Sequence, residues 1–130
     1  MKFASITLEH PKTIKVTYTG IQPSPEQFED YLIELAAMVK ANRGCAQIFD
    51  ATHIRVLPAD LRIRHGQWMK ENERLFTDDV SVTALIVPHM LARLVMRGVY
   101  LIQKPYSPYV VVSTTEEALK YVEEMTSIAA

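Results

Sequence analysis

The segment Cys45–Trp68 constrains the fold of this 130-residue chain more than any other. It begins with the short apolar run Cys45–Asp50, continues through a polar turn rich in titratable side chains, and ends in the first turns of a helix. A short apolar run with a helix on each side is typical of a buried parallel strand. We therefore expect an α/β fold with this strand at the centre of the sheet.

The residues before this segment predict an antiparallel hairpin and one amphipathic helix. Lys2–Leu8 and Thr13–Thr19 alternate in polarity with period two, and the short connection between them favours two paired strands. Ser24 and Gln27 have the spacing of a helix capping box. Gly44 suits the left-handed conformation that ends many helices.

The residues after this segment repeat the rhythm of strand and helix. The expected elements are the helix Asp60–Phe76, the strand Val80–Val87, the helix His89–Gln103, the strand Tyr109–Val112 and the helix Thr114–Met125. Parallel strands in one sheet are joined by right-handed crossovers. The order therefore predicts a single α/β domain over residues 1–130, with four helices and a five-stranded mixed sheet. An N-terminal antiparallel hairpin begins the sheet, and sequential parallel β-α units continue it.

Charge and composition exclude two classes of partner. The net charge of −1 gives no bulk attraction to nucleic acid. The longest apolar-rich segment, Met90–Ile102, is interrupted by Arg93 and Arg97 and is shorter than the ~20 residues that span a bilayer, so no integral membrane segment is expected. The N-terminus lacks the long apolar region of a signal peptide, and the single cysteine, Cys45, fits a reducing compartment. We expect a cytoplasmic protein.

Two short motifs resemble a known family. Ile48–Asp50 is followed by the polar turn Thr52–Ile54, and the strand Tyr109–Val112 is followed by the acidic helix start Glu116–Leu119. With the order of elements, these motifs resemble the STAS/SpoIIAA-like domain, the fold of bacterial anti-sigma factor antagonists. The chain looks most like the small stand-alone bacterial proteins called STAS/Sec14-like. The resemblance implies that fold and a bacterial regulatory role.

The phosphorylation site of that family is absent here. Anti-sigma factor antagonists carry a phosphorylated serine in an Asp-Ser-Ser-Gly motif, where the helix after the Asp-ended strand begins. The corresponding position in this chain falls at Ala59 or Asp60. The resemblance therefore implies a protein without the phosphoserine switch. Thr52 remains a candidate acceptor, because it lies in the polar turn after Asp50.

A group of polar residues is expected at the carboxyl end of the central strand, which is where ligands bind in open α/β sheets. This candidate ligand or partner turn contains Asp50, Thr52, His53, Asp60, Arg62 and His65. Asp and His side chains near one another could do acid–base chemistry, and an arginine could bind a phosphate or carboxylate. The simpler alternative is that the carboxylates bond local backbone amides and charge a helix start.

No nucleophile–base or metal-ligand spacing is present. The histidines lie in four different segments, and no pair has the spacing of metal ligands on one helix. We therefore predict no catalytic residues, no metal and no cofactor. An enzyme using Asp50, His53 and His65 is the weakest of the functions considered.

The helix His89–Gln103 is apolar over most of its circumference, and such a helix needs cover. Its apolar surface can be covered in three ways: by burial in the core, by a second subunit or by a lipid-like ligand. Gly66 and Gly98 interrupt their helices and fit either close packing or a groove. The candidate interface or groove contains Arg93, Met96, Arg97, Val99, Tyr100, Lys104 and Tyr106.

Two functions of different classes follow. The first is a non-enzymatic bacterial regulatory or scaffolding protein that acts through protein–protein contacts with another regulatory protein, and forms a homodimer. The alternative is a carrier or sensor of a small apolar or acyl ligand.

Overall fold

The computed structural model describes residues 2–9, 12–100 and 104–129. The five strands are β1 (Ala4–Glu9), β2 (Thr13–Tyr18), β3 (Cys45–Asp50), β4 (Val80–Ile86) and β5 (Tyr109–Val112). The five helices are α1 (Pro25–Ala41), α2 (Ala59–Glu71), α3 (Glu73–Asp78), α4 (Met90–Tyr100) and α5 (Thr115–Ala129).

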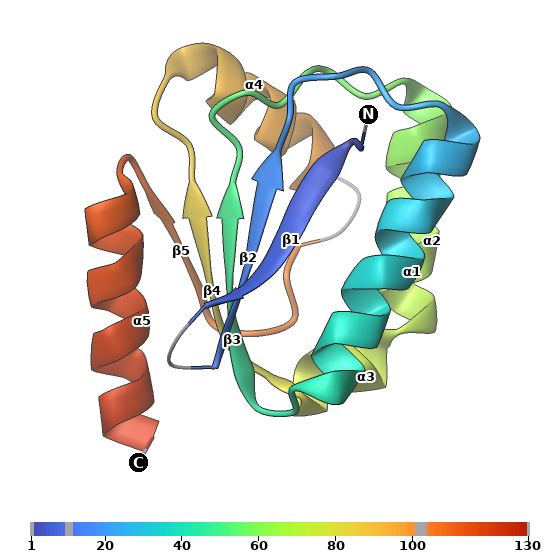
Figure 1. Cartoon of the computed structure of the whole chain (residues 1–130). Helices are drawn as coiled ribbons and strands as arrows, with labels where there is room; N and C mark the ends of the chain where they lie inside the picture. Colours follow the sequence, from blue (N-terminus) through green and yellow to red (C-terminus); the bar gives the residue numbers. More distant parts are fainter. Residues whose placement is uncertain (1, 10–11, 101–103, 130) are drawn as a thin grey trace.

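The strands form one mixed sheet in the order β1-β2-β3-β4-β5, which follows the sequence. Only β1 and β2 pair antiparallel, and each later strand is parallel to its neighbour. The predicted hairpin and the sequential parallel units are confirmed. Figure 1 shows the carboxyl ends of β2, β3 and β4 at the same edge of the sheet, below α4.

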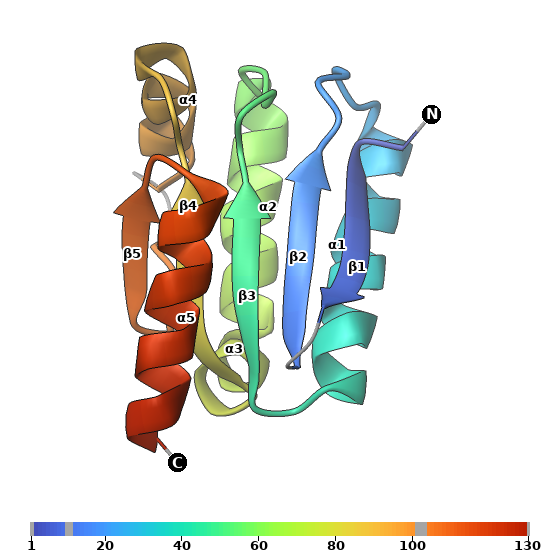
Figure 2. The same ribbon diagram turned by 60° about the vertical axis from the view of Figure 1, so that its left-hand side comes forward.

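The helices divide unequally between the two faces of the sheet. α1, α2, α3 and α4 cover one face, and α5 alone lies on the other, across the β3–β5 side (Figure 2). Alternate residues of β4 show the two environments: Leu85 packs in the core under the four helices, whereas Ala84 and Ile86 pack against α5. The larger core therefore lies between the sheet and the four-helix layer.

Local signals in the sequence explain where α1 begins and ends. The Ser24 hydroxyl accepts a hydrogen bond from the backbone N–H of Gln27 at 3.1 Å, and the Gln27 side chain accepts one from Ser24 N–H at 2.8 Å. This reciprocal pair is the predicted capping box. Gly44 follows the helix with φ of +80°, so the predicted left-handed glycine is confirmed.

The expected single helix Asp60–Phe76 is instead two helices, α2 and α3, which separate at Asn72. The Asn72 side chain donates to the Trp68 carbonyl oxygen at 2.9 Å, and its backbone N–H bonds the same carbonyl. Asparagine competes in this way with regular helical bonding. The prediction of four helices was therefore wrong by one.

α5 begins as the sequence predicts and buries a narrow stripe of side chains against the sheet. The Thr114 hydroxyl accepts from the backbone N–H of Glu117 at 3.2 Å, and Ala118 and Val122 are buried against the sheet. Leu119 is half exposed, because a lone helix on a narrow patch of sheet buries only a narrow stripe. None of the described helices combines the length and the apolar character needed to cross a membrane.

Candidate functional site

Two polar side chains face the four-helix layer from the centre of the sheet. Gln47 of β3 and Thr83 of β4 are neighbours across the parallel pair, and both are almost fully buried. The Thr83 hydroxyl lies 2.7 Å from the hydroxyl of buried Ser107, in the loop before β5, and 3.5 Å from Gln47 Oε1. Gln47 Nε2 is buried and has no hydrogen-bond partner among the described residues. The centre of the sheet thus holds an unused amide donor.

A cavity of about 50 Å³ lies against this polar group. Its walls come from the sheet, from helices α1 to α4 and from the loop before β5. Most of the wall is aromatic or aliphatic, and representative members are Phe28, Leu57, Trp68, Met69, Met96 and Val99. In this conformation the cavity has room for one or two water molecules, whose share of liquid volume is about 30 Å³ each.

His65 of α2 contributes a second unpaired polar atom to the cavity wall. Its ring packs between Phe28 and Trp68, with centroid separations of 6.5 and 6.1 Å. His65 Nδ1 is buried and has no hydrogen-bond partner among the residues described. Burial lowers the pKa of His65 from its ordinary 6.5 to about 4, so the imidazole is neutral at pH 7.

Another part of the wall is built from the aromatic rings of Phe3, of Tyr18 in β2 and of Tyr31 in α1. Phe3 and Tyr31 meet edge to face with centroids 5.2 Å apart, and the hydroxyls of Tyr18 and Tyr31 lie 2.9 Å from each other. Burial raises the pKa of Tyr18 to about 12, although its hydrogen bond to Tyr31 acts the other way. These tyrosines are therefore neutral groups that already have hydrogen-bond partners.

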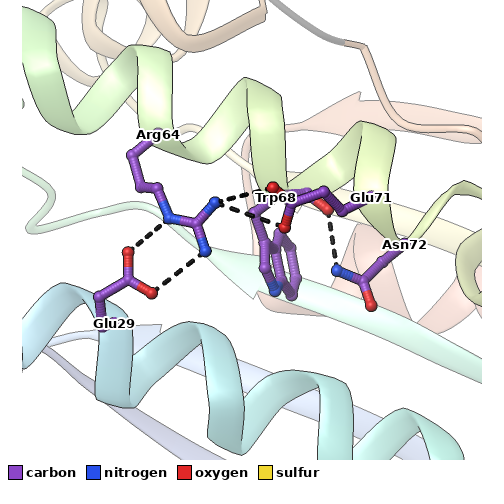
Figure 3. A network of polar contacts seen from close by, with 5 residues as sticks. All are labelled: Glu29, Arg64, Trp68, Glu71 and Asn72. Atoms are coloured by element: carbon purple, nitrogen blue, oxygen red, sulfur yellow. Dashed lines mark hydrogen bonds and ion pairs between the residues drawn. The ribbon is translucent and has the colours of Figure 1, made fainter.

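An ion-pair network fixes α1 against α2, the two helices that bring Phe28 and His65 together. The Arg64 guanidinium contacts both carboxylate oxygens of Glu29, at 2.5 and 3.2 Å, and reaches Glu71 at 3.3 Å (Figure 3). These hydrogen bonds, with Glu29 first, raise the pKa of Arg64. The bidentate geometry defines the orientation of the two helices as well as holding them together.

The residues of the candidate turn do not form one cluster. One oxygen of Asp50 accepts hydrogen bonds from the backbone N–H and the hydroxyl of Thr52, at 3.0 and 2.5 Å. Asp50 therefore performs the local turn function that the sequence allowed. His53 and Asp60 are exposed, with no ion pair in the part of the chain that the structure describes.

Arg62 and His65, three residues apart on α2, contact different parts of the protein. The Arg62 side chain reaches toward α4, where its Nη1 would lie 3.3 Å from a Cβ placed on Gly98. Its Nε is buried without a hydrogen-bond partner among the described residues. Gly98 thus permits the close approach of a guanidinium to the α4 backbone, while His65 faces the cavity.

The candidate groove residues of α4 divide between the cavity and the surface. Met96 and Val99 are buried and line the cavity, together with half-buried Tyr106. Arg93, Arg97 and Lys104 are exposed. The side chain of Tyr100 lies outside the described residues.

The outer side of α4 is apolar as well as its inner side. Met90, Leu91 and Leu94 are exposed by 77%, 61% and 55%. From Val80 to Thr115 the chain contains no aspartate or glutamate. α4 therefore presents exposed apolar side chains among positive charges, while its inner side closes the cavity.

Gln47, Thr83 and Ser107 were not foreseen as site residues. Gln47 and Thr83 interrupt apolar strands, and such residues are ordinarily assigned to an outer face. The parallel strands β3 and β4 are covered on both faces, so a polar residue within either of them should be buried. That reasoning would have found the pair. Among the described residues no three metal-ligating side chains come together.

Comparison with known proteins agrees with this architecture. No family model and no curated protein sequence matches the chain. A solved structure, that of an uncharacterized protein of the DUF3478 family with a SpoIIAA-like fold from Shewanella loihica PV-4, superposes with a TM-score of 0.66. The alignment covers 92% of this chain and 91% of that one, at 11% sequence identity. At that identity the likeness concerns the fold alone. The chain therefore has the SpoIIAA-like fold that its sequence motifs predicted.

Proposed function

We propose that this protein binds a small, largely apolar molecule in the cavity between the sheet and α1–α4, and acts as its carrier or sensor. The observation that carries the proposal is a cavity with aromatic and aliphatic walls, in which the buried atoms Gln47 Nε2 and His65 Nδ1 lack hydrogen-bond partners among the described residues. A buried polar group without a partner costs about 1–3 kcal/mol. A ligand or an ordered water that supplies the missing partner removes that cost.

The cavity must widen to accept anything larger than water. Met69 and Met96 form part of its wall, and the unbranched thioether side chain adapts its shape more readily than other core residues. Val99 and Tyr106 come from α4 and from the loop before β5, which lie at the edge of the four-helix layer. We therefore propose that α4 and residues 105–107 form the movable part of the wall.

We propose that the cavity binds its ligand without catalysing a reaction. The Asp50 carboxylate is already bonded to Thr52, and the cavity wall contains no described cysteine. Nucleophilic catalysis needs a nucleophile beside a base, and this wall supports no such pair among its described residues.

Titration of ethylbenzene and acetophenone into the ¹⁵N-labelled protein tests the proposal. Binding in the cavity should shift amide signals around Gln47, His65 and Val99. Val99→Ile adds a methylene group to the cavity wall and should weaken binding, whereas Val111→Ile, at an exposed position of β5, should not. If neither probe shifts these signals, and native mass spectrometry finds no retained molecule, the cavity holds water alone and the proposed function is wrong.

A second function rests on the outer side of α4. We propose that Met90, Leu91 and Leu94 contact a regulatory protein whose binding surface is apolar at its centre and acidic at its rim. The absence of acidic residues from Val80 to Thr115 supports this choice over a homodimer through the same face, because two copies would oppose Arg93 and Arg97 to themselves.

Sedimentation velocity separates these partners. The wild-type protein is expected to stay monomeric, and a copurifying partner is expected to be lost in Leu94→Glu and at high salt. A concentration-dependent dimer that Leu94→Glu abolishes would assign the face to a second copy. The control is Leu119→Glu, at a half-exposed position of α5 on the other face of the sheet (Figure 2), which should leave the partner bound.

A further inference from the structure

The polar end of the cavity offers a donor and no positive charge. Gln47 presents its amide oxygen to the Thr83 hydroxyl at 3.5 Å, and the Thr83 hydroxyl is also paired with that of Ser107 at 2.7 Å. Gln47 Nε2, with two N–H groups, has no acceptor in the described structure. A ligand that reaches Gln47 therefore meets an unused donor, which requires an acceptor oxygen or nitrogen.

A charged ligand has no counter-ion in this cavity. The described residues that line it include no aspartate, glutamate, lysine or arginine. The imidazole of His65 is neutral at pH 7, because burial lowers its pKa to about 4. Arg62 lies outside the wall, toward Gly98 of α4. Burial of an unpaired carboxylate or phosphate is strongly unfavourable, so this wall excludes fatty-acid anions and phosphate esters.

The rest of the wall favours a flat or short apolar body. The rings of Phe28, His65, Trp68 and Phe76 follow one another along the helix side of the cavity, with neighbouring centroids 5.0–6.5 Å apart. Aromatic rings at such separations favour edge-to-face and offset contacts. The cavity is small, so the size of the ligand depends on how much space the side chains of Met69 and Met96 vacate when they move.

We infer that the ligand of this cavity is an uncharged, compact molecule with one acceptor oxygen, of the ketone, aldehyde, ester or amide class, whose oxygen accepts from Gln47 Nε2. This inference rests on the proposed function and specifies its ligand. It narrows the apolar or acyl class expected from the sequence by excluding free acids.

Three probes of similar size test the inference on the full-length protein at pH 7.4. Acetophenone has a carbonyl acceptor, ethylbenzene has none, and benzoate carries a charge. Acetophenone should bind at least about tenfold more tightly than ethylbenzene, because it relieves the unpaired donor as well as filling apolar space. Benzoate should not bind at concentrations that saturate the protein with acetophenone.

Variants at position 47 test whether the preference for acetophenone over ethylbenzene depends on the Gln47 side chain. Gln47→Met keeps the length of the side chain and removes the donor, and should reduce acetophenone affinity to that of ethylbenzene without weakening ethylbenzene. Gln47→Leu is a second variant with the same expectation, in case one of them fails to fold. Gln67→Leu, at an exposed position of α2, should change neither affinity.

The possible results distinguish a failure of this inference from a failure of the proposed function. Equal affinity for acetophenone and ethylbenzene, or tighter binding of benzoate, would overturn the inference and leave apolar binding in place. An acetophenone preference that survives both variants at position 47 would also overturn it. If none of the three probes binds, the proposed function itself fails.

Discussion

His89 Nε2 lies 2.8 Å from the carbonyl oxygen of Thr52 and joins the start of α4 to the turn after β3. On the other side of the ring, Nδ1 accepts the backbone N–H of Ala92 at 3.2 Å. A nitrogen that accepts carries no proton, so Nε2 carries it and donates to Thr52. This side chain thus caps α4 and joins it to the turn after β3.

We predict that His89→Ala loosens α4 more than it destabilises the whole protein. Loss of a helix cap costs about 1 kcal/mol, and the Thr52 carbonyl loses its donor as well. Amide hydrogen exchange should accelerate along α4 while β2 and β3 stay protected. His53→Ala, at an exposed position one residue from Thr52, is the matched control. Unchanged exchange in α4 would show that its packing alone holds the helix.

His65 should make stability depend on pH in the acid range. The unfolded chain binds a proton on His65 below pH 6.5, whereas the folded protein resists it until about pH 4. The contribution of His65 to the free energy of unfolding is therefore fully present above pH 6.5, and it is lost as the pH falls toward 4. The slope is up to about 1.4 kcal/mol per pH unit.

Urea unfolding at several pH values measures that slope. His65→Phe keeps an aromatic ring beside Phe28 and Trp68, and removes the titration, so its unfolding free energy should be flatter between pH 6.5 and 4. All other residues are identical in the two proteins, so their contributions cancel in the comparison. Identical pH profiles for the two proteins would mean that His65 is protonated as easily in the folded state as in the unfolded one.

The ion pair between Arg64 and Glu29 should contribute modestly and depend on salt. The side chains of Arg64 and Glu29 are 31% and 41% exposed, so a double-mutant cycle with Glu29→Gln and Arg64→Met should give a coupling of about 0.5–1 kcal/mol. The coupling should shrink at 1 M NaCl, because salt screens exposed charges. A cycle with Glu71→Gln, whose contact is longer, should give less. A larger coupling for Glu71 would contradict the bidentate geometry drawn in Figure 3.

Two glycine-to-alanine substitutions should have opposite effects. Gly98→Ala should stabilise the protein by up to about 1 kcal/mol, because alanine favours the helix and the end of Arg62 can move aside. Gly44→Ala should destabilise it by a similar amount, since φ of +80° is strained for alanine. Thermal unfolding of both variants gives the comparison. A destabilised Gly98→Ala would mean that the Arg62 guanidinium is fixed in place.

The sheet was predictable from the sequence because alternation and capping are local. Ser24 and Gln27 place the start of α1 from four residues of sequence. The division of α2 from α3 was not predictable from apolar periodicity. It depends on how the Asn72 amide bonds the Trp68 carbonyl, which competes with the continuing helix.

The candidate site was less predictable because its polar residues look ordinary in sequence. Asp50 and His53 attract attention as titratable groups, yet Asp50 is engaged by its own turn. Gln47 and Thr83 carry no charge, and only the two covered faces of the sheet reveal that they must be buried. α4 presented the opposite difficulty: Met96 packs inside while Leu94 lies outside, and a helix apolar on both sides does not indicate which side is which.

Gln47 is a side chain that a chain selected only for stability would not retain. Leucine or methionine at this position would remove the unpaired amide and should raise the melting temperature. In a library sorted for heat resistance alone, position 47 should therefore drift to an aliphatic residue. Sorting the same library for capture of a carbonyl compound should return glutamine, so the two selections would distinguish a residue kept for folding from one kept for binding.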